Sequence, residues 1–177
     1  NNIGIYDPDD GPVGSYISGP PHGKGDMAFW GGVLTSDGKV IMIPSYSDNI
    51  GIYDPDDGPI GSYTDGPSVS GKISPKFHGG VITPTGKIIL IPFNSSTIGI
   101  YDPDDGTIGS YTDGPTHNEG FSAFNGGALT ISGKIIMAPR SSDHIGIYDP
   151  NSGTIGSYTS GVAHGQSDKS FSGAVLE

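Results

Sequence analysis

The chain has 177 residues, of which 33% are hydrophobic, and it carries a formal net charge of −11. That charge disfavours nucleic acid and anionic membrane surfaces as partners, and no run approaches the ~18 apolar residues of a membrane span. We therefore expect neither a nucleic-acid partner nor membrane insertion. Its 31 glycines and 15 prolines recur at fixed places, which indicates turn formers rather than disorder.

A nine-residue stretch near the N-terminus, Ile3 to Gly11, sets the register of the whole sequence. It returns at intervals of about 47 residues, as 50–58, 98–106 and 145–153. A repeat of this length is typical of a solenoid, a propeller or an array. We expect a single repeat domain over 1–177, with repeats at about 1–48, 49–96, 97–143 and 144–177, the last of them incomplete.

Each repeat contains four short strand candidates and no segment of helical period and length. The first candidate, Asn2–Tyr6, has two isoleucines on one face, and the turn Asp7–Gly11 leads to a return strand at Val13–Tyr16. After a loop of variable content comes Phe29–Thr35, whose paired glycines indicate that backbones crowd together there. The last candidate, Lys39–Pro44, is apolar at consecutive positions, as in a strand buried on both faces.

Four short antiparallel strands in each unit of about 47 residues predict an all-β fold, a β-propeller built of four-stranded antiparallel blades. The rival architecture is an open β-solenoid or fibre that stacks the same units in a line.

The repeats resemble those of kelch-type propellers in three motifs. These are Ile-Tyr-Asp-Pro on one strand, Gly-Pro after the next, and Gly-Lys-Ile-Ile near the end of the unit, and the resemblance covers all 177 residues. The chain has Ile43-Pro44 where that family has Gly-Gly, and Val13 where it has Trp. The resemblance implies that Phe-x-Gly-Gly is the innermost strand and that complete blades span about 29–63, 77–111 and 124–158.

In that strand order, 2–16 is the outer half of one blade and 171–177 the inner strand of another. A closed ring removes open sheet edges, but these two ends together still lack one strand. We therefore expect a partial ring, or a part of a larger assembly. The expected partners are further repeats, or other copies of the chain, that complete the ring.

The blade-to-blade loops differ most among the repeats, whereas the Asp-Pro-Asp-Asp-Gly turns on the other face are nearly uniform. Diverged loops on one face of a repeat scaffold often carry binding specificity, although long loops also drift freely. Candidate ligand-binding residues are those that follow the recurrent phenylalanine, three loop histidines and one arginine: Trp30, His78, Asn125, Ser172, His22, His117, His164 and Arg140.

Two of these groups have a specific chemistry. Trp30, the only tryptophan, is either a platform for a sugar ring or a side chain partly buried between blades. The three loop histidines recur at one position of the repeat, so they either bind a transition metal or sense pH, or they stabilise their loops.

Oxygen donors cluster in the uniform turns, and alternating aspartates in a loop that ends in glycine supply some of the ligands that calcium takes. The spacing is not that of an EF-hand, and hairpin-turn chemistry explains the same residues without a metal. No other cofactor is expected. The candidate calcium ligands are Asp7, Asp9, Asp10, Asp54, Asp56, Asp57, Asp102, Asp104 and Asp105.

The sequence contains no motif of a catalytic site: no serine in an elbow sequence, no metal-binding histidine pair at helical spacing and no Gly-rich phosphate loop. We therefore predict a non-enzymatic binding or structural β-propeller, extracellular or on a particle surface, that recognises a glycan or a protein through its variable loops. The alternatives are a self-assembling repeat protein that forms a larger ring, coat or filament, and a glycan-active enzyme.

Overall fold

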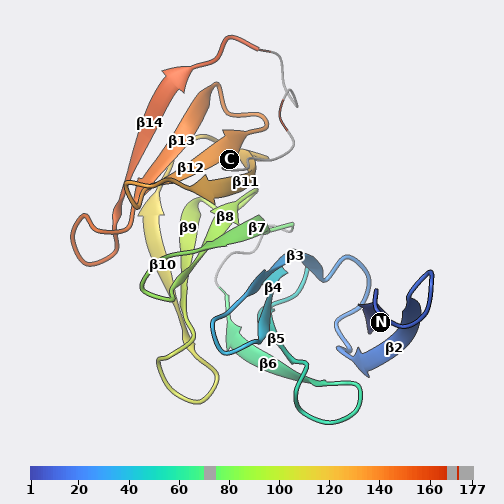
Figure 1. Cartoon of the computed structure of the whole chain (residues 1–177). Helices are drawn as coiled ribbons and strands as arrows, with labels where there is room; N and C mark the ends of the chain where they lie inside the picture. The colour runs from blue at the N-terminus through green and yellow to red at the C-terminus, as the bar shows by residue number, and fades with distance from the viewer. Residues whose placement is uncertain (70–74, 167–170, 172–177) are drawn as a thin grey trace.

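A computed structural model describes residues 1–69, 75–166 and 171, and every regular element in these ranges is a β-strand. The strands form three four-stranded antiparallel sheets and one two-stranded sheet (Figure 1). The prediction of an all-β fold with four-stranded antiparallel blades is confirmed. Within the described ranges the chain has no helix long and apolar enough to cross a membrane.

The two-stranded sheet, here called the N-terminal hairpin, consists of β1 (Asn2–Asp7) and β2 (Ser15–Pro21). In each four-stranded sheet, here called a blade, the strands lie side by side in chain order. The first blade is β3 (Phe29–Leu34), β4 (Val40–Pro44), β5 (Asn49–Asp54) and β6 (Ser62–Ser68). The second is β7 (Phe77–Ile82), β8 (Ile88–Pro92), β9 (Thr97–Asp102) and β10 (Ser110–Thr116). The third is β11 (Phe124–Leu129), β12 (Ile135–Pro139), β13 (His144–Asp149) and β14 (Ser157–Ala163).

The turn between the third and fourth strands of a blade is held by one aspartate and one tyrosine. In the second blade, Asp102 Oδ1 accepts a hydrogen bond from the backbone N–H of Asp104 at 3.2 Å. The hydroxyl of Tyr101 donates to the backbone carbonyl of Ile108 at 3.1 Å, across the turn. The turn also needs a positive φ, which Gly109 supplies at 74°. The repeated sequence therefore builds the repeated hairpin from local contacts.

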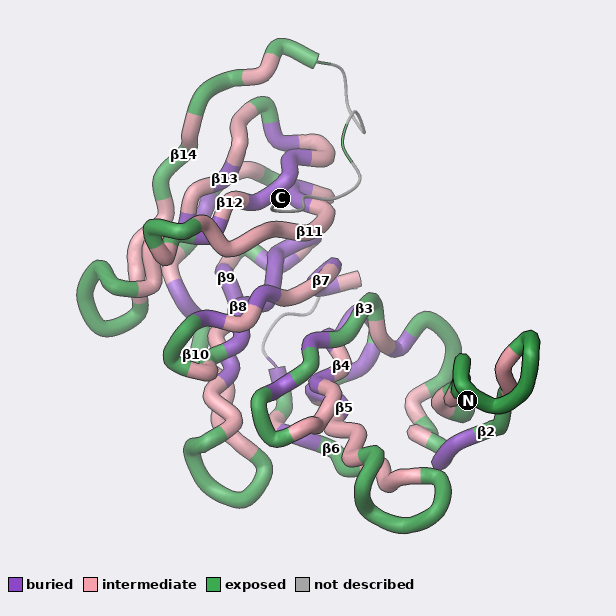
Figure 2. Tube along the Cα trace, viewed as in Figure 1, coloured by how far each residue is buried: buried purple, intermediate pink, exposed green. Residues whose placement is uncertain are grey.

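The hydrophobic core lies between neighbouring blades rather than inside any one of them. Ile41 and Ile43 of the first blade belong to one buried cluster with Tyr101 of the second. A second cluster repeats this arrangement between the second and third blades, with Ile89, Ile91, Met137 and Tyr148. Buried residues are accordingly concentrated where blades face each other (Figure 2). A blade therefore depends on its neighbour for its core.

The first strands of the three blades, β3, β7 and β11, are neighbours in space, and each contains a β-bulge. A glycine inside each bulge has a positive φ: 83° at Gly31, 89° at Gly79 and 107° at Gly126. The backbones approach closely there, because a Cβ built on Gly79 would lie 3.6 Å from Gly126 Cα. Since bulges redirect the side chains beside them, the residue before each glycine departs from the regular alternation of the strand.

Candidate functional site

The residues that precede the three bulge glycines meet one another, although they are far apart in sequence. The indole of Trp30 stacks on the imidazole of His78, with ring centroids 4.3 Å apart and planes 7° apart. His78 Nδ1 lies 2.9 Å from Oδ1 of Asn125. The three side chains therefore form one line across three blades, here called the axial row.

Two loop residues extend the axial row. Phe93 and Arg140 both follow the proline that ends the second strand of their blade. The ring of Phe93 stacks on His78 with centroids 3.7 Å apart, and Arg140 Cζ lies 4.8 Å from the centroid of Phe93. Two rings cannot occupy the same face of an imidazole at these distances, so His78 is sandwiched between Trp30 and Phe93.

The state of His78 follows from its surroundings. Only 4% of its surface is exposed. Burial lowers the pKa of His78, the bond with Asn125 raises it and the charge of Arg140 lowers it, for a net shift downward. The ring is therefore neutral at pH 7. Because Asn125 Oδ1 is an acceptor, Nδ1–H donates to it, and Nε2 keeps its lone pair.

Buried polar atoms without a partner are rare in proteins, and the axial region contains one of them. Over the described residues, two buried side-chain atoms have no hydrogen-bond partner in the protein: His78 Nε2 and Ser45 Oγ. Ser45 occupies, in the first blade, the position of Phe93 and Arg140 in the others. Both atoms therefore belong to repeat positions that contribute to the axial row or to its extension.

The three loop histidines, in contrast, contact their own and neighbouring loops. His117 Nδ1 accepts from the backbone N–H of Glu119 at 3.1 Å, and Nε2 donates to the carbonyl of Ser95 at 2.7 Å. Its ring meets Phe124 edge-on, and burial is the main cause that lowers the pKa of His117. His164 makes the corresponding contacts with Gln166, Ser142 and Phe171, and His22 with Lys24 and Phe29. These histidines shape loops and do not converge on one site.

The aspartates considered as calcium ligands lie in the hairpin turns. The first aspartate of each turn accepts a backbone N–H, for Asp7 at 2.9 Å and for Asp54 at 3.1 Å. Over residues 1–69, 75–166 and 171, no group of three or more histidine, aspartate or glutamate side chains is arranged to hold a metal ion. The observed role of these first aspartates is therefore that of turn formers.

The sequence candidates thus divide into two sets. Trp30, His78, Asn125 and Arg140 belong to one cluster, the loop histidines lie outside it, and Ser172 lies outside the described residues. Sequence reasoning missed Phe93, although a signal existed. The residue after the strand-ending proline differs in every repeat, just as the residue after the recurrent phenylalanine does.

No protein-family model and no curated protein matches the sequence. Among solved structures, the chain resembles selenomethionine-substituted virginiamycin B lyase from Staphylococcus aureus, with 18% identity and a TM-score of 0.67 over 86% of this chain and 47% of that one. It also resembles a catalytically inactive histidine-to-alanine variant of that enzyme with Quinupristin, with 19% identity and a TM-score of 0.61 over 85% of this chain and 46% of that one. The chain thus spans about half the length of these structures.

These neighbours confirm the β-propeller architecture, whereas they do not show kelch-like repeats. They contradict the predictions of a non-enzymatic binding or structural protein and of a chain that is not an enzyme, because the shared fold is that of an enzyme. At 18% and 19% identity the likeness itself establishes the fold alone. The physical reason for the error is that a propeller can bring together side chains from several repeats, as it does with Trp30, His78 and Asn125, so the absence of a local catalytic motif does not exclude an enzyme.

Proposed function

We propose that the chain forms part of a propeller enzyme that cleaves a bond by elimination, with His78 as the base. In an elimination, a base takes a proton from one carbon while a leaving group departs from the next. The observation that carries the proposal is the buried Nε2 of His78, which has no partner in the described protein and bears a lone pair. The similarity to a lyase that loses activity when a histidine becomes alanine supports it.

The surroundings of His78 suit proton transfer. Asn125 selects the tautomer that leaves Nε2 free of hydrogen, and burial together with Arg140 keeps the pKa of His78 below its usual range. A base is active only in its deprotonated form, so this downward shift keeps His78 competent throughout the neutral range. Positive charge from Arg140, near the same stack, is placed to favour an anionic substrate or intermediate.

Access to His78 requires one side chain to move. Phe93 is 6% exposed and fixed in the core, whereas Trp30 is 45% exposed and covers the other face of the imidazole. Because the lone pair of Nε2 lies in the plane of the imidazole, at its edge, we infer that Trp30 moves far enough to uncover that edge when substrate enters, and that its ring then lines the site. This assigns Trp30 to substrate admission and His78 to the chemical step.

The test is turnover of Quinupristin, followed by chromatography, by the wild-type chain and by two variants. His78→Phe keeps a ring in the stack but has no nitrogen, so we expect its rate to fall on the order of 100-fold or more. His22→Asn is the matched control, because His22 lies outside the axial row, and it should retain the rate. Absence of turnover by the wild-type chain, or equal rates for His78→Phe and wild type, would overturn the proposal.

The pH dependence of the rate gives a second readout. Protonation removes the lone pair of Nε2, and the pKa of His78 is shifted downward. The rate should therefore be constant through neutral pH and fall only below the ordinary histidine value of about 6.5. A rate that falls already as pH drops from 8 to 7 would contradict this assignment.

We also propose that a further repeat supplies a strand to the open edge of β1. Among the described residues β1 pairs with β2 alone, whereas β9 pairs on both sides. In the second blade, the strand beside β9 is β8, and Lys87 directly before β8 places its Nζ 3.1 Å from Asp102 of β9. Asp7 is the counterpart of Asp102, so a strand preceded by a lysine would fit beside it. The second strands of the three blades, β4, β8 and β12, are already paired on both edges, so none of them is available to β1.

A labelled peptide of residues 84–93, which carries β8 and its lysine, tests this idea. It should bind the chain, and Asp7→Lys should weaken the binding because two lysines would then face each other. Asp54→Lys is the control, since β5 already has both neighbours. Equal binding by the wild-type chain and Asp7→Lys would argue against strand addition at β1.

A further inference from the structure

Two cavities lie between neighbouring blades, at the opposite end of the inner strands from the axial row. The first, of about 310 Å³, lies between the first and second blades, and the other, of about 410 Å³, between the second and third. His78 is the second residue of β7, whereas Ile82 at the end of that strand lines the first cavity. Both volumes fall in the range of about 300–1,000 Å³ that small-molecule sites occupy.

The two cavities are built from the same positions of the repeat. The apolar floor of the first contains Ile41, Ile52 and Tyr101. The floor of the second contains their equivalents Ile89, Ile100 and Tyr148. At the rim, a threonine and a lysine recur in both cavities: Thr35 and Lys39 in the first, Thr83 and Lys87 in the second. One framework thus appears twice in the molecule.

That framework is fixed by its own hydrogen bonds. Tyr101 and Tyr148 are each 1% exposed, and their hydroxyls donate to the carbonyls of Ile108 and Ile155, both at 3.1 Å. At the rim of the first cavity, Thr35 Oγ1 donates to the carbonyl of Lys39 at 2.9 Å. A ligand would therefore enter a preformed site with little ordering of the protein, which favours binding.

The two cavities differ in charge. Four aspartates line the first cavity, namely Asp37, Asp54, Asp57 and Asp104, together with a single lysine. That lysine, Lys39, already pairs with Asp37 at 2.8 Å. In the second cavity, Thr85 and Asn151 stand at the places of Asp37 and Asp104, and the described lining contains no carboxylate.

We propose that the cavity between the first and second blades binds a small organic cation, a protonated amine on an apolar body of about one ring. The isoleucines of the floor receive the apolar body, and Asp57 and Asp104 at the rim receive the ammonium group. The cavity and its apolar floor define the site, and the rim decides the sign of the ligand's charge. The second cavity, with the same floor and without carboxylates, is not expected to select a cation.

Backbone amide NMR titrations test this directly, with 2-phenylethylammonium, neutral 2-phenylethanol and anionic phenylacetate as probes. The ammonium probe should shift the signals of first-cavity residues such as Thr35, Gly86 and Thr107. We expect it to bind about tenfold more tightly than the alcohol and to weaken with added salt, because partly exposed carboxylates provide the difference. Signals of the second cavity, such as Gly133, should shift no more with the ammonium probe than with the alcohol.

Because the two cavities share one framework, their rim residues can be exchanged by substitution. Asp37→Thr with Asp104→Asn gives the first cavity the residues of the second at these two positions while Asp54 and Asp57 remain, and should weaken ammonium binding about tenfold. Thr85→Asp with Asn151→Asp places the carboxylates that correspond to Asp37 and Asp104 in the second cavity, and should create ammonium binding there. His78→Phe lies outside both cavities and should leave the titrations unchanged.

Spectral dispersion of each variant verifies that it is folded before binding is compared. Three results would overturn the proposal. These are no saturable shift at the first cavity with the ammonium probe, equal affinity for the ammonium and the alcohol, and unchanged affinity in the Asp37→Thr, Asp104→Asn double variant.

Discussion

The N-terminal hairpin and the outer hairpin of the second blade have nearly the same sequence and very different surroundings. Tyr6 donates its hydroxyl to the carbonyl of Val13 at 3.0 Å, and Tyr101 does the same to Ile108 at 3.1 Å. Yet Tyr6 is 61% exposed and Tyr101 only 1%. The repeat therefore encodes the hairpin locally, whereas burial comes from the neighbouring blade.

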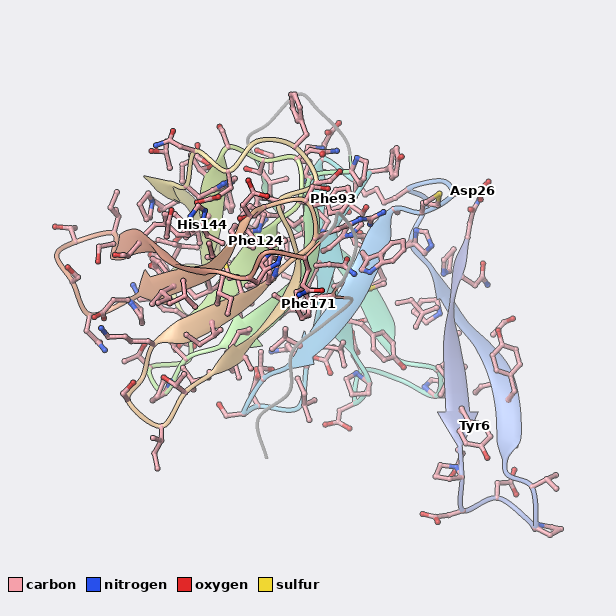
Figure 3. All side chains as sticks on the ribbon, turned by 90° about the horizontal axis from the view of Figure 1, so that it is seen from above. Tyr6, Asp26, Phe93, Phe124, His144 and Phe171 are labelled. Carbon is pink, nitrogen blue, oxygen red and sulfur yellow. The ribbon has the colours of Figure 1, made fainter. Side chains whose placement is uncertain are left out.

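The figures show the same contrast in space. The residues of the N-terminal hairpin are largely exposed, whereas those of β8 are buried and those of β9 are buried or half-buried (Figure 2). Seen from above, the hairpin that carries Tyr6 extends away from the three blades (Figure 3). Three pairs of substitutions at equivalent positions measure how much of the stability depends on this difference.

The largest difference is expected for the tyrosines. Tyr101→Ala empties a fully buried site in the core between two blades and should lower the free energy of unfolding by about 3–5 kcal/mol. Tyr6→Ala removes an exposed ring and should cost less than about 1 kcal/mol. Urea unfolding measures both. Similar losses would mean that the hairpin is covered in solution.

An intermediate difference is expected for the turn glycines, which both have a positive φ. In Gly109→Ala the new Cβ would overlap the ring of Tyr101, which is held in the core, so we expect a loss of about 2–4 kcal/mol. In Gly14→Ala it would lie 2.5 Å from the hydroxyl of Tyr6, whose exposed ring can turn away, and 2.6 Å from the backbone carbonyl of Asp7, which must shift. The loss should therefore exceed the strain of the positive φ, about 1 kcal/mol, and stay below the loss at Gly109.

Thermal unfolding of Gly109→Ala and Gly14→Ala compares the two losses of stability. Gly11 provides a control within the chain. Gly11 has a φ of 77°, and nothing lies within 4 Å of a Cβ built there. Gly11→Ala should therefore report the cost of the backbone conformation alone. Gly14→Ala should cost more than Gly11→Ala, because its Cβ also meets the backbone carbonyl of Asp7. If Gly14→Ala costs as much as Gly109→Ala, Tyr6 is held more firmly than its exposure indicates.

The smallest difference is expected for the aspartates that begin the turns. Asp102→Asn preserves the side-chain acceptor for the turn but removes the ion pair with Lys87, so stability should fall by about 0.5 kcal/mol at low salt. Asp7→Asn should change it by close to zero, because no described lysine faces Asp7. Denaturation at about 0.05 and 1 M salt distinguishes the two, since screening should remove the effect at Asp102. An effect at Asp102 that persists at high salt would indicate a cause other than the ion pair.

Those features of the fold that arise from local chemistry could be predicted from sequence. The alternation in Asn2–Tyr6 and the turn Asp7–Gly11 predict the hairpin, and the consecutive apolar residues of Lys39–Pro44 predict a central strand. Exposure could not be predicted in the same way. Tyr6 and Tyr101 stand in almost identical sequences, and only the position of the adjacent blade separates them.

The candidate site was predictable only in part. Comparing the repeats singles out Trp30, His78 and Asn125, because they follow a recurrent phenylalanine and differ from one another. The stacking on Phe93 and the missing partner of His78 Nε2 depend on how three bulges align, which no single repeat contains. For the same reason, the absence of a local catalytic motif did not bear on whether the fold supports an enzyme.

The bulge in each inner strand has a consequence for evolution by duplication. The recurrent phenylalanine belongs to the core at Phe77 and Phe124, and the following glycines accommodate the backbone, whereas the residue between them belongs to neither hydrophobic core cluster. After a repeat is copied, a single codon change at that place alters the chemistry of the axis without changing those core clusters. The array can therefore vary one side chain per copy toward a common centre, and Trp30, His78 and Asn125 are three outcomes of that freedom.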